Sequence, residues 1–162
     1  MKPQKTPNLA ARKKQPNPSG VLKLADGLIK YSLPDGRGWE LPLSQIKVIG
    51  EHTNSDGPHL DDYFFVFVLP DGSWHFASYY ANGAESFYLE LSSNLGCSLK
   101  FGLTKSTSLK SRVMWPKDLE GKDLFNLVPE PPSKNYLIRL GQKISPTVRF
   151  ELSEPVRKAL NL

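Results

Sequence analysis

The chain has 162 residues, 39% of them hydrophobic, and a formal net charge of +5. This length fits one domain that can bury enough surface to fold without disulfides or a structural metal. Cys97 is the only cysteine, which excludes an internal disulfide, and no apolar run is long enough for a transmembrane helix. We therefore expect a cytoplasmic protein without a membrane span.

The charge is distributed unevenly along the sequence. Residues 1–20 hold five bases and no acid, residues 21–97 hold four bases against ten acids, and residues 98–162 hold twelve bases against six acids. The chain beyond residue 20 is therefore neutral, which argues against a general nucleic-acid binder. Because residues 1–20 also contain four prolines and few apolar groups, we predict a disordered basic tail there, without a secretory signal.

Strand patterns dominate the next part of the chain. Residues 28–33 alternate between polar and apolar, and strands are also predicted over 39–43 and 45–49. The run YFFVFVL over 63–69 is apolar on both faces, which is typical of a central strand covered on both sides. The sequence LPDG occurs at 33–36 and at 69–72, and each copy predicts a tight hairpin turn. The second turn leads into a strand over 73–80.

A helix is predicted over 84–95, where apolar residues recur at helical spacing and Gly96 follows the end. Beyond it we expect strands over 98–103, 136–140 and 147–152, and a short helix starting at Ser153. The pattern over 104–128 predicts no definite element. The sequence PEPP at 129–132 indicates an extended linker.

The predicted fold class is α+β, with an antiparallel sheet and one packed amphipathic helix. We divide the chain into the tail at 1–20, a single domain at 21–128 and a proline-linked C-terminal extension at 129–162.

Three sequence blocks carry a resemblance to a known family. LADGLIKYSL, WELPLSQIKVIGE and YFFVFVLPDGSWHF are followed by the amphipathic helix, and together residues 24–95 resemble a divergent bacterial pleckstrin-homology-like domain. The resemblance implies a strongly curved antiparallel sheet closed by a helix, and a binding module without catalysis. Residues 97–162 depart from the family pattern, in which the helix ends the domain. Phosphoinositide binding does not carry over, because the LPDGRG loop has Arg37 as its one base, beside Asp35.

The strongest candidate binding segment is the basic stretch 98–117. No acid occurs from residue 91 to residue 116. The aromatic rings of Phe101 and Trp115 could stack on nucleic-acid bases. The candidate binding residues are Lys100, Lys105, Lys110, Arg112 and Trp115. The alternative is that the aromatic rings belong to the core, while the charges are solvated or pair with the acidic half of the chain.

The loop at 51–62 collects histidines and carboxylates, which can bind a transition metal. His52, His59 and Asp61 are weak metal candidates, since their spacing matches no known signature. The alternative is a polar connection between two strands. Cys97 follows the predicted helix C-terminus, where the helix dipole disfavours a thiolate, so we predict a small buried hydrophobe there.

No catalytic residue and no cofactor is predicted, and the sequence contains no phosphate-binding loop. The leading hypothesis is a non-catalytic interaction or scaffold module that binds another protein. One alternative is nucleic-acid or anionic-ligand binding through residues 98–117. The other is a metal-dependent enzyme that uses the loop at 51–62.

Overall fold

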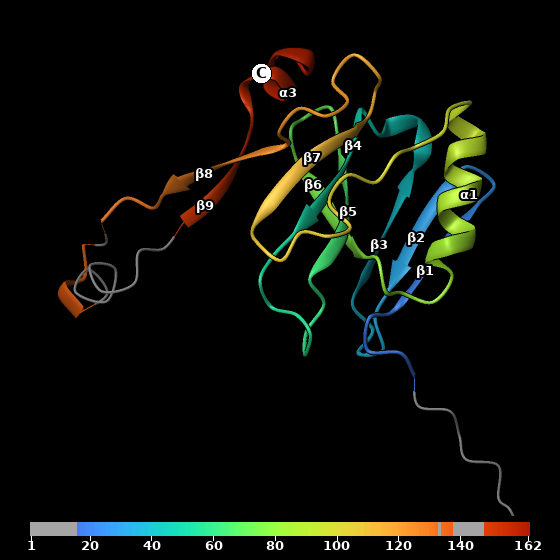
Figure 1. Ribbon diagram of the computed structural model, residues 1–162, viewed down its shortest axis with the longest axis horizontal. Helices are drawn as coiled ribbons and strands as arrows, with labels where there is room; N and C mark the ends of the chain where they lie inside the picture. Colours follow the sequence, from blue (N-terminus) through green and yellow to red (C-terminus); the bar gives the residue numbers. More distant parts are fainter. Residues whose placement is uncertain (1–15, 133, 138–147) are drawn as a thin grey trace, which may run out of the picture.

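The computed structural model describes residues 16–132, 134–137 and 148–162 (Figure 1). It has an α+β fold in which every pairing of strands is antiparallel and one main helix packs against a sheet core, as predicted. The first sheet has the order β1-β2-β3. Its strands are β1 (Val21–Ala25), β2 (Leu28–Ser32) and β3 (Gly38–Pro42).

The second sheet has the order β6-β5-β4-β7, and the third pairs β8 with β9. The strands of these two sheets are β4 (Val48–Thr53), β5 (Tyr63–Val68), β6 (Trp74–Ser78), β7 (Lys110–Trp115), β8 (Phe125–Pro129) and β9 (Val148–Leu152). The strong sheet curvature implied by the resemblance is not confirmed, because the strands divide among sheets that are not strongly curled.

Both LPDG sequences form the predicted hairpin turns by the same local chemistry. Gly36 and Gly72 adopt left-handed backbone conformations with φ of +89° and +83°, which glycine enters at little steric cost. In each turn the aspartate accepts a hydrogen bond from the backbone N–H two residues on, at 3.0 Å for Asp35 and 2.9 Å for Asp71. The turns connect β2 to β3 and β5 to β6.

The prediction of a doubly covered central strand is confirmed for β5, which has a hydrophobic core on each face. Phe65 and Phe67 point into the first core, which also holds side chains of the first sheet and of α1 (Ala84–Leu95). Val66 and Val68 point into a second core on the opposite face. Alternate residues of a strand face opposite sides of a sheet, so an unbroken apolar run serves both cores.

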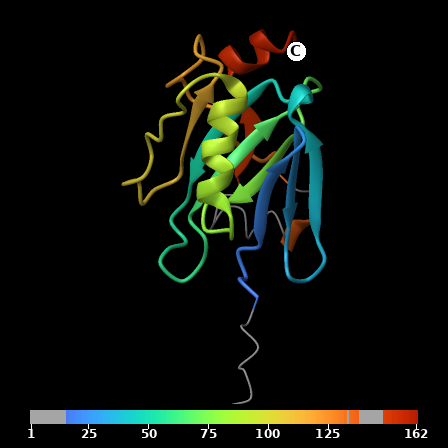
Figure 2. The ribbon, with the colours of Figure 1, turned by 90° about the vertical axis from the view of Figure 1, so that its right-hand side faces the viewer.

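The helix α1 has the predicted bounds. Gly83 and Gly96 flank it, both in the left-handed conformation, and Gly96 donates its N–H to the carbonyl of Ser93. Phe87 and Leu91 are almost completely buried one turn apart on the face that meets the first core. Figure 2 shows α1 lying across the strands.

The region after α1 differs from the prediction. Residues 98–103 form no strand, so that prediction is wrong; the segment is a loop whose Leu99 is buried in the first core. The prediction of a buried Cys97 is also wrong, because this residue is exposed. The strand β7 and the start of β8 lie in the stretch for which the sequence predicted no element.

The C-terminal extension is joined to the body. The predicted strand and helix correspond to β9 and α3 (Glu154–Ala159). Because β9 pairs with β8, the hairpin crosses the predicted boundary at residue 129, and Leu152 and Val156 are buried in the second core. Away from that core, β8 and β9 project from the body (Figure 1). Most of the strand predicted over 136–140 lies outside the described residues.

Residues 1–15 of the predicted tail also lie outside the described residues. Residues 16–20 are described and contact the body: Ser19 is buried, and its carbonyl accepts a hydrogen bond of 2.8 Å from the Tyr31 hydroxyl. In the described part of the chain, no helix has the length and apolar composition needed to cross a membrane.

Candidate functional site

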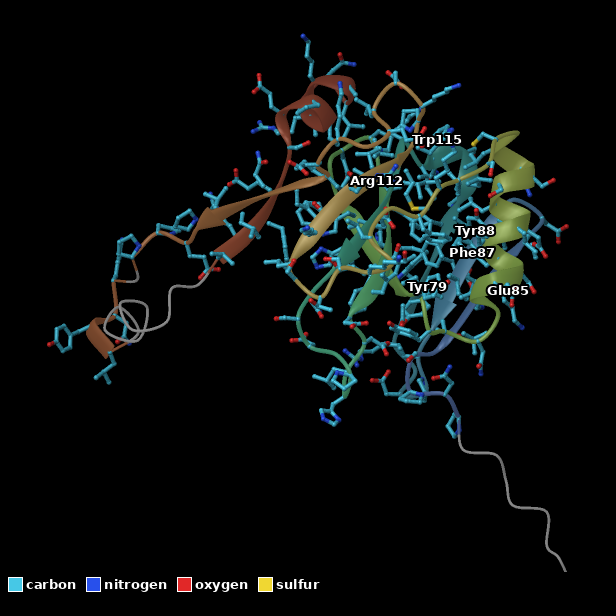
Figure 3. All side chains as sticks on the ribbon, viewed as in Figure 1. Tyr79, Glu85, Phe87, Tyr88, Arg112 and Trp115 are labelled. Atoms are coloured by element: carbon cyan, nitrogen blue, oxygen red, sulfur yellow. The ribbon has the colours of Figure 1, made fainter. Side chains whose placement is uncertain are left out.

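The predicted basic site is divided by the structure. Lys100, Lys105 and Lys110 are exposed. Trp115 is partly buried and packs against the first core, and Arg112 is largely buried (Figure 3). Phe101 packs against the same core. The aromatic rings therefore belong to the core, and three lysines remain at the surface.

Arg112 is bound to a buried carboxylate that the sequence did not single out. Glu51 on β4 has no exposed side-chain surface, and its Oε1 atom lies 3.1 Å from a guanidinium nitrogen of Arg112 on the neighbouring strand β7. The Tyr63 hydroxyl donates a hydrogen bond to Glu51 Oε2. Burial, together with this bond to the carboxylate, raises the pKa of Tyr63 well above its usual range.

Glu51 and Arg112 also bind the loop after α1 to the second sheet. The Gly102 N–H donates a hydrogen bond of 2.7 Å to Glu51, and Arg112 donates one of 2.8 Å to the Lys100 carbonyl. A guanidinium nitrogen of Arg112 also lies 3.7 Å from Glu120. Each charge is compensated, which a buried ion pair requires. Arg112 is therefore a structural residue.

The weak metal candidates are not brought together. His52 is buried on the face of the second core, whereas His59 is exposed in the loop between β4 and β5. Asp61 accepts hydrogen bonds from the hydroxyls of Ser19, at 2.9 Å, and Ser78, at 2.6 Å. Among the described residues, no group of three or more histidine, cysteine or acidic side chains is placed to hold a metal ion.

His52 instead forms part of an aromatic cluster. Its ring lies 5.1 Å from that of Phe150 and 5.6 Å from that of Phe76, with Phe64 and Phe125 slightly farther away. Burial lowers the pKa of His52, and a hydrogen bond to the backbone of residue 110 offsets part of that effect. Its Nδ1 atom is buried without a hydrogen-bond partner in the described structure.

Beside this cluster, the outer edge of β7 is only partly covered. Val113 donates its N–H to the Lys122 carbonyl and accepts a hydrogen bond from the Gly121 N–H, so its peptide groups point away from β4. Peptide groups two residues apart on a strand point in the same direction, so those of Ser111 also point outward. Within the described residues, the Ser111 backbone N–H and C=O have no protein partner on that side.

At this part of the edge, the start of β8 bonds to the Ser111 side chain and not to the backbone of β7. The backbone N–H of Phe125, at the start of β8, donates a hydrogen bond of 2.9 Å to Ser111 Oγ. This bond takes the place of a ladder bond between two backbones. From that point β8 pairs with β9 and diverges from β7 (Figure 1).

The divergence leaves a pocket of about 750 Å³ along the outer edge of β7. Leu103 and Leu109 line it from the loop after α1, and Phe125, Leu127 and Phe150 line it from the hairpin. The strand contributes residues 110–112, and Asp123 and Asn126 add polar groups. We call this site the β7 groove. It combines apolar walls with unpaired backbone groups, the two features that an extended peptide requires.

Sequence reasoning identified Lys110 and Arg112 in this region but not the groove itself. The deciding group is the backbone of Ser111, which no residue pattern reveals. Comparisons with protein-family models, curated proteins and solved structures give no match to this chain.

Proposed function

We propose that this protein is a non-catalytic interaction module that binds another protein in the β7 groove. The observation that carries the proposal is that the Ser111 N–H and C=O point outward into a pocket with apolar residues on its walls and have no partner among the described residues. An incoming strand would satisfy both groups and bury the apolar walls at the same time.

The surroundings of the edge support this proposal. Proteins usually protect edge strands by covering or charging them, because an open edge can pair with another chain. Here residues 121 and 122 cover the edge at Val113, while Ser111 is left open within the same strand. The edge of β7 is thus covered at Val113 and open at Ser111, where apolar side chains flank it. This arrangement is consistent with the binding of a partner strand at Ser111 alone.

The resemblance to pleckstrin-homology-like domains points in the same direction, since it implies a binding module without catalysis. The proposal differs in its location. It places the partner at the edge of β7, beyond residues 24–95, which carry the resemblance. Arg112 and Trp115 are assigned to the framework beneath the site, and Lys110 to its border.

Site-specific photo-cross-linking in the organism that produces the chain tests the proposal. A photoreactive phenylalanine analogue replaces Leu109, which lines the groove, or Leu89, which is 61% exposed on α1. We expect a discrete cross-linked protein from position 109 and none from position 89. Failure to cross-link from position 109, or the same product from both positions, would contradict the proposal.

A further inference from the structure

We infer that the occupant of the β7 groove is an extended peptide segment of another protein, in which a short apolar stretch is flanked by acidic residues. This inference rests on the proposed function and adds the chemistry of the partner. Its three elements are the backbone geometry, the apolar walls and the local charge.

The backbone geometry requires an extended occupant. The Ser111 N–H and C=O lie on the edge of a regular strand, so their natural partners are the C=O and N–H of another strand. A helix satisfies its own peptide groups and would leave those of Ser111 unpaired. Strand addition is therefore the mode that uses this edge.

The walls define the centre of the occupant. A strand paired with β7 directs alternate side chains to opposite faces of the second sheet. Beside it the pocket is lined by Phe125, Leu127 and Phe150 from the hairpin and by Leu103 and Leu109 from the loop after α1. Because both walls are apolar, neighbouring residues at the centre of the occupant should all be apolar.

The charges define its flanks. Lys105 and Lys110 are exposed on the loop and the strand that border the groove, and Lys122 is exposed in the segment that covers the edge at Val113. Arg112 is already compensated by Glu51 and Glu120, and Asp123 is the one acid that lines the pocket among the described residues. Acidic flanks on the occupant would complement this excess of lysine.

The same charges argue against a second copy of this chain. Two antiparallel copies paired at Ser111 would place Lys110 of each chain opposite Arg112 of the other, so cations would face each other. Like charges placed opposite each other are unfavourable in strand pairing. The structure therefore favours a foreign, acidic partner over self-association.

The test uses the full chain and a synthetic peptide with a central valine–leucine–valine triplet flanked on each side by two glutamates. Two matched peptides serve as controls: one carries lysine in place of glutamate, and the other is N-methylated at alternate central residues, which removes N–H donors while keeping the side chains. Binding is followed by titration, and hydrogen exchange of the Ser111 amide reports pairing at the edge.

We expect the acidic peptide to bind and to slow exchange of the Ser111 N–H, and the two control peptides to bind at least about tenfold more weakly. The double variant K105E/K110E should weaken binding of the acidic peptide by about tenfold or more at low ionic strength. The variant K23E/K47E changes the net charge equally at exposed sites away from the groove, and should leave binding within about twofold.

Each contrary result has a distinct meaning. Equal binding of the acidic and lysine peptides, with the Ser111 amide protected by both, would overturn the acidic flanks and leave the proposed groove intact. Binding of the acidic peptide without protection of Ser111 would overturn strand addition. Absence of binding by the acidic peptide would overturn the inference, whereas loss of the cross-link from position 109 is what contradicts the proposed function. A single-stranded oligonucleotide that displaces the acidic peptide and depends on Lys105 and Lys110 would replace the peptide with a nucleic acid.

Discussion

At the scale of single residues, His52 shows how one side chain can make stability depend on pH. Its ring is buried among four phenylalanine rings, and the buried Nδ1 atom has no partner within the described structure. A protonated imidazole would be poorly solvated there, so burial lowers the pKa of His52 below the ordinary value of 6.5. The folded state therefore favours the neutral ring.

We predict that His52 makes the protein less stable as the pH falls below about 6.5. In that range the unfolded chain binds a proton at this residue and the folded chain does not, so protonation favours unfolding. The contribution is fully present above pH 6.5 and is lost as the pH falls toward the lowered pKa of the folded state. For a single proton the slope is at most about 1.4 kcal/mol per pH unit.

Urea unfolding of the wild type and of His52→Leu at a series of pH values measures this contribution. The variant should lose the extra slope, while His59→Gln, which removes a histidine from an exposed loop, should keep it. Parallel stability curves for the wild type and His52→Leu between pH 6.5 and pH 5 would contradict the assignment.

At the scale of elements, the Glu51–Arg112 pair holds β7 and the loop after α1 against β4. The loop has little regular structure. It is held by Leu99 in the first core and by the hydrogen bonds that its Lys100 and Gly102 backbone groups make with Arg112 and Glu51. The loop in turn supplies Leu103 and Leu109 to the groove. The ion pair therefore contributes to the shape of the proposed binding site.

We predict that Arg112→Met destabilises the protein by about 3 kcal/mol, because it leaves the Glu51 carboxylate buried without its counter-charge. The double variant E51Q/R112M should recover a large part of that loss, since it removes the uncompensated charge. Equilibrium unfolding of the single and double variants measures the coupling between the two residues. Additive losses would show that the pair is not coupled.

The elements also show what the sequence could predict. The bounds of α1 followed from its helical periodicity, and the position of β5 followed from an unbroken apolar run whose alternate residues serve two cores. The strand β7 was missed because its sequence, KSRVMW, mixes charged and apolar residues without a clear period. Its Arg112 faces the core only because Glu51, 61 residues earlier, compensates it. A partner so distant in the sequence leaves no local pattern.

The candidate site was predictable only in part, for the same reason. The acid-free stretch drew attention to Lys110, which lines the groove, and to Lys105 in the loop that supplies Leu103 and Leu109 to it. The opening itself depends on where β8 leaves β7, which the hydrogen bond from Phe125 to Ser111 Oγ determines. Serine in a strand gives no indication that its hydroxyl replaces a backbone partner.

At the scale of the whole molecule, the C-terminal segment completes the second core. Leu152 and Val156 are buried in the second core and help to cover the face of the second sheet that carries Val66 and Val68. Ser153 adds two hydrogen bonds, from its N–H to the Leu124 carbonyl and from its hydroxyl to the Asp123 carbonyl. The sequence placed a boundary at residue 129 because of its prolines, but the burial crosses that boundary. We therefore expect the described body and α3 to unfold together.

We predict that Val156→Asp lowers the free energy of unfolding of the entire body by at least about 3 kcal/mol, because it places an unpaired charge in the second core. Arg157→Asp alters the charge of the same helix at an exposed position and should cost less than about 1 kcal/mol. Thermal unfolding is followed by the fluorescence of Trp39 and Trp115, which pack against the first core, and of Trp74, which packs against the second. In the Val156→Asp protein, a single transition shifted to lower temperature at every tryptophan indicates one cooperative unit. A shift confined to Trp74 would instead show that the second core and α3 unfold as a separate domain.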